Sequence, residues 1–171
     1  MAEFSLRAAR PDELHNFVAI DDAAGELFAA AGLVIALEEG HPFVLAESLR
    51  WASAIEQGLA HVAVDCQNIP IGFVTLSIVD GEPYLDQIAV LPSYMRRGVG
   101  TSLLNYAISW SAGRSLWLTT YAHLPWNGPY YERHGFVVIN ESECGPEICA
   151  ILRAQREVLP DPDQRVAMLR R

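Results

Sequence analysis

The chain has 171 residues, enough for one domain with a substantial core and too few for two of ordinary size. Its composition, 51% hydrophobic and 19% charged, is typical of a soluble globular protein and excludes a disordered chain. A net charge of −9 disfavours nucleic acid as a partner. It would favour a cationic substrate, although solubility explains it equally well. We predict a single domain over residues 1–171.

Near the N-terminus, a short strand over residues 4–7 is expected to precede a helix that begins near Pro11, because proline suits a first turn. The buried face of this helix is predicted from its apolar residues, Leu14, Phe17, Val18 and Ile20. The Asp21-Asp22 pair would continue it on the exposed side. A less regular helical region over residues 23–39 and a regular helix over residues 42–57 are expected next.

The rest of the chain is predicted to contain further strands and helices. Two antiparallel strands, residues 61–65 and 71–79, lead through the hairpin signal Asp80-Gly81 into a central strand over residues 85–91. A helix follows, and then come a strand at 115–121, a strand at 135–140, a helix at 146–157 and a strand at 166–169. The central strand and the strand at 115–121 are joined by one parallel crossover, which indicates a mixed sheet.

The turn after the central strand carries the clearest chemical signal. Pro92 ends the strand, and the sequence Arg96-Arg97-Gly98-Val99-Gly100-Thr101 opens the next helix. Glycines allow the backbone to approach a ligand, and the free N–H groups of a helix start attract anions. Two arginines strengthen that field. The turn therefore indicates a phosphate-binding site.

The same stretch resembles motif A of the GNAT superfamily of acyl-CoA-dependent N-acetyltransferases. The match consists of Ile88-Ala89-Val90-Leu91-Pro92, then Met95-Arg96-Arg97-Gly98-Val99-Gly100, then Leu103-Leu104. Met95 stands where the family usually has Gln or Arg. A second match is Tyr131-Glu132-Arg133-His134-Gly135-Phe136, which is similar to the end of the family's later helix. Asn127 lies four residues before Tyr131, where seven is usual, in a Pro-Trp-Asn-x-Pro-x-Tyr form that looks like one bacterial branch.

The resemblance runs from about Phe4 to the end and is specific over residues 84–136. It implies an α+β GNAT fold, a mixed, mostly antiparallel sheet of six to seven strands flanked by helices, with splayed central parallel strands. It also implies acetyl-CoA as cosubstrate and a primary amine of a small molecule or protein as acceptor. In the family, the early helical region forms one wall of the acceptor cleft. This makes Glu26, Phe28 and Leu33 candidates to touch substrate, although Phe28 and Leu33 fit a core role as well.

The resemblance also implies roles for single residues at the matching positions. The pyrophosphate of the cofactor would bind at the turn, which consists of Arg96, Arg97, Gly98, Val99, Gly100 and Thr101. Pantetheine pairs with the main chain of Ile88 and Val90, with Ala89 pointing away. Asn127 would hydrogen-bond pantetheine or the turn, or else cap the following helix. Tyr131 corresponds to the general acid that protonates the departing thiolate, and a packed aromatic is the alternative.

The general base stays open. Asp86 and Gln87 begin the central strand, and only one of them can face the cleft, because side chains alternate along a strand. Glu26 could act from the opposite wall and His123 from the end of the strand at 115–121. We favour Asp86 or Glu26 acting through water.

Two other functions remain open. The first is a regulatory or interaction module that binds CoA through the turn but does not catalyse acetyl transfer. The second is a protein that binds a different phosphorylated ligand through the turn alone. Neither a disulfide scaffold nor a metal site is expected, because the three cysteines form no Cys-x-x-Cys pair and the five histidines show no paired helical spacing. No segment could span a membrane and no signal peptide is apparent, which predicts a cytoplasmic protein without a membrane partner. Monomer and homodimer are both compatible with the sequence.

Overall fold

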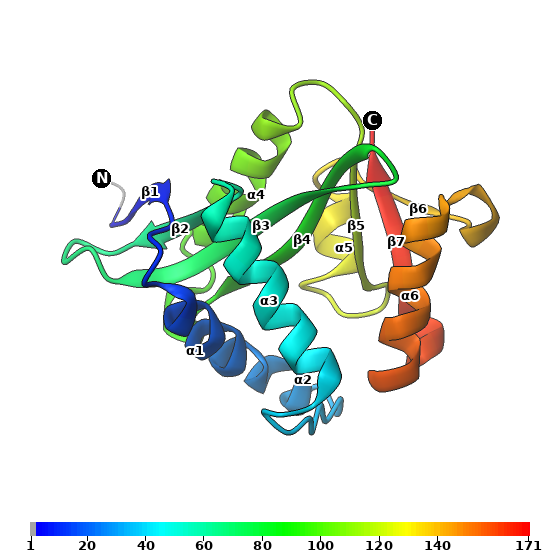
Figure 1. Cartoon of the computed structure of the whole chain (residues 1–171), viewed down its shortest axis with the longest axis horizontal. Helices are drawn as coiled ribbons and strands as arrows, with labels where there is room; N and C mark the ends of the chain where they lie inside the picture. The colour runs from blue at the N-terminus through cyan, green and yellow to red at the C-terminus, as the bar shows by residue number, and fades with distance from the viewer. Residues whose placement is uncertain (1–2) are drawn as a thin grey trace. The chain divides into compact units, whose positions relative to one another are not determined.

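The computed structural model describes residues 3–171 and contains a mixed sheet with flanking helices (Figure 1). The seven strands are β1 (Ser5–Ala8), β2 (Ala60–Val64), β3 (Pro70–Val79), β4 (Glu82–Val90), β5 (Leu116–Tyr121), β6 (Val137–Ile139) and β7 (Arg165–Arg170). Their order in the sheet is β1-β2-β3-β4-β5-β7-β6. Only β4 and β5 pair in parallel, with Tyr84 opposite Trp117, among the pairs with a defined register in the described chain. The predicted mixed, mostly antiparallel sheet and its parallel crossover are confirmed.

Six α-helices are found among the described residues, α1 (Leu14–Ala24), α2 (Glu26–Ala30), α3 (Pro42–Glu56), α4 (Val99–Trp110), α5 (Gly128–Glu132) and α6 (Pro146–Val158). The chain divides into two compact units. The first comprises the chain up to Ser77 together with Gln87–Trp110, and the second comprises Ile78–Asp86 and Ser111–Arg171. That residues 1–171 act as a single domain stays a prediction.

In the first unit, α1 and α3 lie side by side and bury an aromatic cluster (Figure 1). The rings of Phe17 and Phe73 stack with their centroids 4.2 Å apart, and Trp51 meets Phe73 edge-on at 5.2 Å. Gly72, the neighbour of Phe73 on β3, points to the other face of the sheet. A Cβ on Gly72 would lie 3.2 Å from side chains of α4 and 3.0 Å from the Ala89 carbonyl oxygen. The absent side chain therefore lets α4 pack closely on β3.

Two expectations for the early helical region were wrong. Of residues 23–39, only Ala23 and Ala24, which end α1, and Glu26–Ala30 are α-helical, because Gly32 takes a left-handed conformation (φ +87°) that ends α2. Leu33 then turns inward and is buried, which fits its core role, and Phe28 is partly buried. Val18, predicted on the buried face of α1, is 37% exposed, whereas Phe17 and Ile20 are buried as expected.

In the second unit, α6 lies along β7 (Figure 1) and packs Ile148 and Leu152 against Tyr84 and Ala167. The N-terminus of α6 is capped from a distant part of the chain. The Asp80 carboxylate accepts hydrogen bonds from the backbone N–H groups of Glu147 at 2.9 Å and Ile148 at 3.0 Å. The Asp80 N–H in turn donates to the Glu147 carboxylate. This reciprocal arrangement satisfies free N–H groups of the helix.

The cap also depends on two backbone conformations. Asp80 and Gly81 have φ values of +50° and +75°, as the predicted Asp-Gly hairpin turn requires. A Cβ on Gly145, at the N-cap position of α6, would collide with the Asp80 carboxylate and displace it from the cap. The hairpin turn and the start of α6 are thus fitted to each other.

We expect Asp80→Ala and Gly145→Ala each to lower the free energy of unfolding by about 1–2 kcal/mol, because each removes the same cap. The double variant should lose less than the sum, since the second change removes an interaction already lost. Urea unfolding of the four proteins measures this coupling. Additive losses would show that the two residues act separately.

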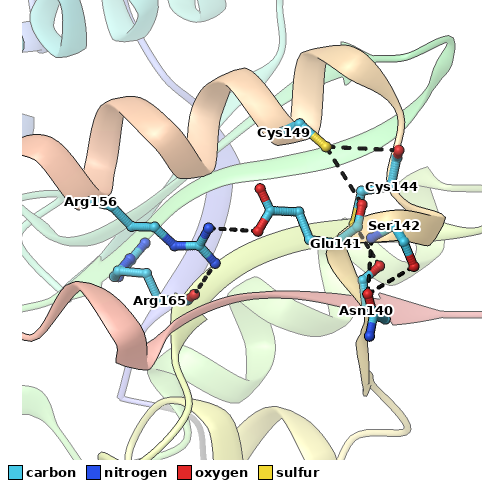
Figure 2. A network of polar contacts seen from close by, with 7 residues as sticks. All are labelled: Asn140, Glu141, Ser142, Cys144, Cys149, Arg156 and Arg165. Atoms are coloured by element: carbon cyan, nitrogen blue, oxygen red, sulfur yellow. Dashed lines mark hydrogen bonds and ion pairs between the residues drawn. The ribbon is translucent and has the colours of Figure 1, made fainter.

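A second set of contacts joins the segment before α6 to the end of that helix (Figure 2). The Arg156 guanidinium donates to a Glu141 carboxylate oxygen at 2.6 Å and to the Arg165 carbonyl oxygen at 3.0 Å. The Asn140 side chain accepts from the Ser142 N–H at 3.0 Å and begins a short 3₁₀ turn there. These contacts fix the C-terminal half of α6 on the first residue of β7.

Among residues 3–171, none of the helices combines the length and the apolar character that crossing a membrane would require.

Candidate active site

The predicted phosphate turn, residues 96–101, lies in the first unit between β4 and α4. After β4, the Leu91 N–H donates to the Ile71 carbonyl oxygen at 2.8 Å, and Pro92–Tyr94 form a 3₁₀ turn. Arg96 and Gly98 then adopt left-handed conformations with φ values of +60° and +83°. α4 begins directly afterwards at Val99, so the start of the helix, where its backbone N–H groups point, lies at this place. The predicted turn between strand and helix is present, and its role in binding phosphate stays a prediction.

The two arginines of the turn differ in their contacts. Arg97 donates to the Glu3 carboxylate at 3.0 Å and lies over the Tyr94 ring, 5.4 Å from its centroid. Arg96 is exposed. A cavity of about 430 Å³ adjoins them, lined by Glu3, Phe4, Tyr94, Arg97, Gly98, Val99 and Ser102. A carboxylate thus already contacts the guanidinium that the sequence assigns to phosphate.

The side chains of β4 alternate between its two faces. Ala89 is 7% exposed and belongs to the cluster that α1 and α3 cover. Gln87 lies on that same face, where it contacts α1, and Ile88 lies on the opposite one. The Ala89 side chain therefore points into the core, and the pairing role of the Ile88 and Val90 main chain stays a prediction.

Gln87 contacts a carboxylate that the sequence placed on the exposed side of a helix. Its Nε2 donates to Asp21 Oδ1 at 2.6 Å, which joins β4 to α1. Asp21 is partly buried and Asp22 is exposed, so the predicted exposure of the Asp21-Asp22 pair is correct only for Asp22. Burial raises the pKa of Asp21 to about 6, although the hydrogen bond from Gln87 acts in the opposite direction, and the charge of Asp22 raises it further.

Tyr131 lies on α5 in the second unit. The helix begins at Gly128, where a Cβ would lie 2.5 Å from the Ala122 carbonyl oxygen, so only glycine fits. Asn127 occupies the N-cap position of α5, but its side chain makes no capping hydrogen bond there. The capping alternative for Asn127 is therefore wrong, and its predicted role toward pantetheine stays a prediction.

The two adjacent tyrosines differ in their surroundings. Tyr131 is 6% exposed, and its ring meets Phe136 at 5.7 Å and Tyr130 at 5.4 Å. Burial raises the pKa of the Tyr131 phenol well above its ordinary value, which keeps the hydroxyl protonated. Tyr130 is partly exposed and its ring lies 4.6 Å from that of His134. Tyr131 is thus the desolvated member of the pair.

The other base candidates are spread over both units. Glu26 is exposed in the first turn of α2, in the first unit. Asp86 and His123 belong to the second unit with Tyr131 and Asn127. Asp86 is partly buried, and His123 is exposed with its Nε2 3.5 Å from Asp161 Oδ2. The roles of these residues stay predictions.

A buried arginine in the second unit was not foreseen. Arg165 is 9% exposed, lies 4.6 Å over the Tyr121 ring, and donates to Gln155 Oε1 at 2.9 Å. Gln155 continues the chain of polar contacts to Thr119 Oγ1 at 3.0 Å. Burial lowers the pKa of the guanidinium. An arginine at the start of a strand gives no sequence signal for such burial.

Comparison with known proteins bears on this site. Residues 36–136 match the model of the acetyltransferase (GNAT) family. The chain is similar in structure to PaiA N-acetyltransferase from Thermoplasma acidophilum in complex with coenzyme A, with 15% identity, TM-score 0.69 and 98% of each chain covered. An acetyltransferase of the GNAT family from Staphylococcus aureus Mu50 has 14% identity, TM-score 0.70 and 98% of each chain covered.

N-acetylglutamate synthase from Neisseria gonorrhoeae, complexed with coenzyme A and N-acetylglutamate, also matches. It has 17% identity and TM-score 0.68, and the match covers 100% of this chain but 35% of the synthase. These similarities show a shared fold. Within residues 3–171, no group of three or more His, Cys, Asp or Glu side chains is arranged to hold a metal ion.

Proposed function

The chain belongs to the acetyltransferase (GNAT) family, and on that premise we propose that it is an N-acetyltransferase. It would move an acetyl group from acetyl-CoA to a primary amine of a small molecule or protein, by direct attack in a ternary complex. The observation that carries the proposal is the phosphate turn, in which left-handed Arg96 and Gly98 lead directly into the N-terminus of α4. Two of the similar structures hold coenzyme A, which supports acetyl-CoA as the donor.

Binding of the cofactor would use mainly the first unit. The N–H groups of Gly98, Val99, Gly100 and Thr101 and the side chains of Arg96 and Arg97 would meet the pyrophosphate. Arg97 would then exchange the Glu3 carboxylate for a phosphate oxygen. The main chain of Ile88 and Val90 would pair with pantetheine, and Asn127 would add a hydrogen bond.

The chemistry then forms one bond and breaks another. The amine lone pair attacks the thioester carbonyl carbon, and a backbone N–H of β4 would stabilise the oxygen that becomes negative. The C–S bond breaks as the amide forms, and the thiolate needs a proton. Full transfer from a phenol of pKa ~10 to a thiol of ~8.5 is uphill by roughly 2 kcal/mol, and burial of Tyr131 increases this cost. Tyr131 would therefore donate a strong hydrogen bond to the developing thiolate, with proton exchange afterwards.

Thiol release from acetyl-CoA, measured over a panel of alkylamines, diamines and lysine-containing peptides, tests the proposal. Mass spectrometry should find a product heavier than the amine by one acetyl group. No release with any amine, together with normal calorimetric binding of CoA, would indicate a CoA-binding module without turnover.

We further expect kcat/KM for the amine to fall several-fold as salt rises. Asp21, Asp22, Glu26 and Asp86, in a chain of net charge −9, would attract a cationic amine, and salt screens that attraction. The measurement uses saturating acetyl-CoA, so that only encounter with the amine is varied. Asp22→Asn should make the salt dependence shallower. A flat profile for the best amine would contradict electrostatic attraction.

A further inference from the structure

We propose that Asp21, held in place by Gln87, binds the ammonium group of the acceptor and removes its proton. This inference rests on the proposed function and names the base that the sequence left open. It replaces Asp86 and Glu26 by a residue that the sequence had assigned to the exposed side of a helix.

The position of Asp21 follows from one hydrogen bond. Gln87 Nε2 donates to Asp21 Oδ1 at 2.6 Å, which holds the carboxylate against β4. Gln87 directly precedes Ile88, the residue whose main chain would pair with pantetheine. All three residues belong to the same unit as the phosphate turn. The carboxylate is therefore fixed beside the part of β4 where the thioester would lie.

The electrostatic setting of Asp21 points to a cationic ligand. Asp21 and Asp22 lie in the last turn of α1, which has no basic residue, and the negative end of a helix disfavours acidic side chains. Within residues 3–171, Gln87 is the sole hydrogen-bond partner of the Asp21 carboxylate, and no cation pairs with it. Such an uncompensated, partly buried carboxylate is unfavourable for folding and suited to an ammonium ion.

The groups around Asp21 also adjust its basicity. Burial is the main cause that raises the pKa of Asp21, the hydrogen bond from Gln87 on β4 lowers it, and the charge of Asp22 on the same helix raises it further. The third element nearby, α3, packs on α1 through apolar residues such as Trp51. With burial, these surroundings bring the pKa to about 6. Asp21 is then still ionised at neutral pH, yet it accepts a proton on the order of 10²-fold more readily than an ordinary aspartate.

Asp21 takes up one proton during the reaction and releases it afterwards. The ammonium proton moves to the free oxygen of Asp21, which leaves an amine lone pair on nitrogen. That lone pair forms the C–N bond to the acetyl carbon, and the C–S bond breaks to give a thiolate. The nitrogen then loses a second proton to become an amide, and this loss balances the proton that the thiolate gains. Asp21 afterwards returns its proton to water, so that one amide and one thiol are formed per turnover.

The test compares Asp21→Asn with Asp22→Asn, which removes the same charge from the exposed neighbour. The substrate is the amine that the wild-type enzyme acetylates fastest in the panel. For the wild type, kcat/KM should decline below pH about 6, because protonated Asp21 cannot act as base. Asp21→Asn should lower kcat by about 10²–10³ and lose this acidic limb. Asp22→Asn should keep the limb and move it to lower pH, because the charge of Asp22 raises the pKa of Asp21.

A stability measurement gives a readout that does not depend on turnover. The raised pKa of Asp21 means that the folded state binds a proton between pH about 6 and about 4, where the unfolded chain does not. Ionised Asp21 therefore lowers the free energy of unfolding. This loss has its full size above pH about 6 and vanishes below pH about 4. Asp21→Asn should have a higher Tm than the wild type at pH 8 and an equal Tm at pH 4.

The outcomes separate the two proposals. If the wild type acetylates an amine and Asp21→Asn keeps its rate and acidic limb, the assignment of Asp21 is wrong while the proposed function stands. An equal Tm at pH 8 for both proteins would also overturn it, since the carboxylate would then carry no burial cost. If the wild type releases no thiol with any amine, the proposed function fails and this inference with it.

Discussion

Tyr131→Phe should slow acetyl transfer by about 10²–10³, the range that positioned acid–base groups contribute. The substitution removes one hydroxyl and keeps the ring, which packs against Phe136 and Tyr130. The described residues supply no hydrogen-bond partner for this hydroxyl, so the fold should lose little with it. CoA affinity should be nearly unchanged, because the affected group is the departing thiolate. Single-turnover kinetics with acetyl-CoA and the best amine measure the effect.

Tyr130→Phe is the matched control, because the same atom is removed one residue away. Tyr130 is partly exposed and sits beside His134 and Arg133, so its loss should cost much less. The opposite ranking of the two variants would transfer the acid role to Tyr130. Full activity in both would mean that water protonates the thiolate and that Tyr131 serves only packing.

Gly98→Val should weaken CoA binding by about 10–100-fold, equivalent to one or two lost hydrogen bonds to a charged phosphate. Gly98 has a φ of +83°, which a β-branched residue adopts only with strain. No atom lies within 4 Å of a Cβ placed there, so the effect would come from the backbone and from the space the phosphate needs. Isothermal titration calorimetry with CoA measures it, and Gly100→Val tests the second glycine.

Gly58→Val is the control for strain alone. Gly58 also has a positive φ, +72°, with nothing within 4 Å of its Cβ, but it follows α3 and not the phosphate turn. Both variants should lose about 1–2 kcal/mol of stability from left-handed strain, and only Gly98→Val should lose CoA affinity. Unchanged affinity in Gly98→Val and Gly100→Val would refute the phosphate-binding role of the turn.

Most of the fold could be predicted because its signals are local. The Asp80-Gly81 hairpin, the glycine turn before α4 and the apolar periods of the strands depend on neighbouring residues only. The predicted extent of the helical region that contains α2 was wrong for a related reason. Residues 23–39 have helical composition, but the left-handed Gly32 ends the helix, and an isolated glycine in a helical pattern does not reveal whether it breaks it.

The candidate site was predictable where a motif carries the chemistry, at the phosphate turn and at Tyr131. It was not predictable where two distant side chains make the environment. Asp21 and Gln87 are 66 residues apart, and an aspartate near a helix end looks solvent-exposed until its partner is known. Arg165 is similar, because its burial depends on Tyr121 and Gln155, which come from other elements.

The bond between Asp80 and Ile148 bears on the order in which the chain folds. It closes a loop of 68 residues, so its entropic cost must be met before the bond contributes. An isolated helix of 13 residues, the length of α6, is marginal in water without such support. The start of α6 therefore gains its cap only when the β3–β4 hairpin has formed and has been brought to it. α6 is then a late element whose helical state is a consequence of tertiary structure.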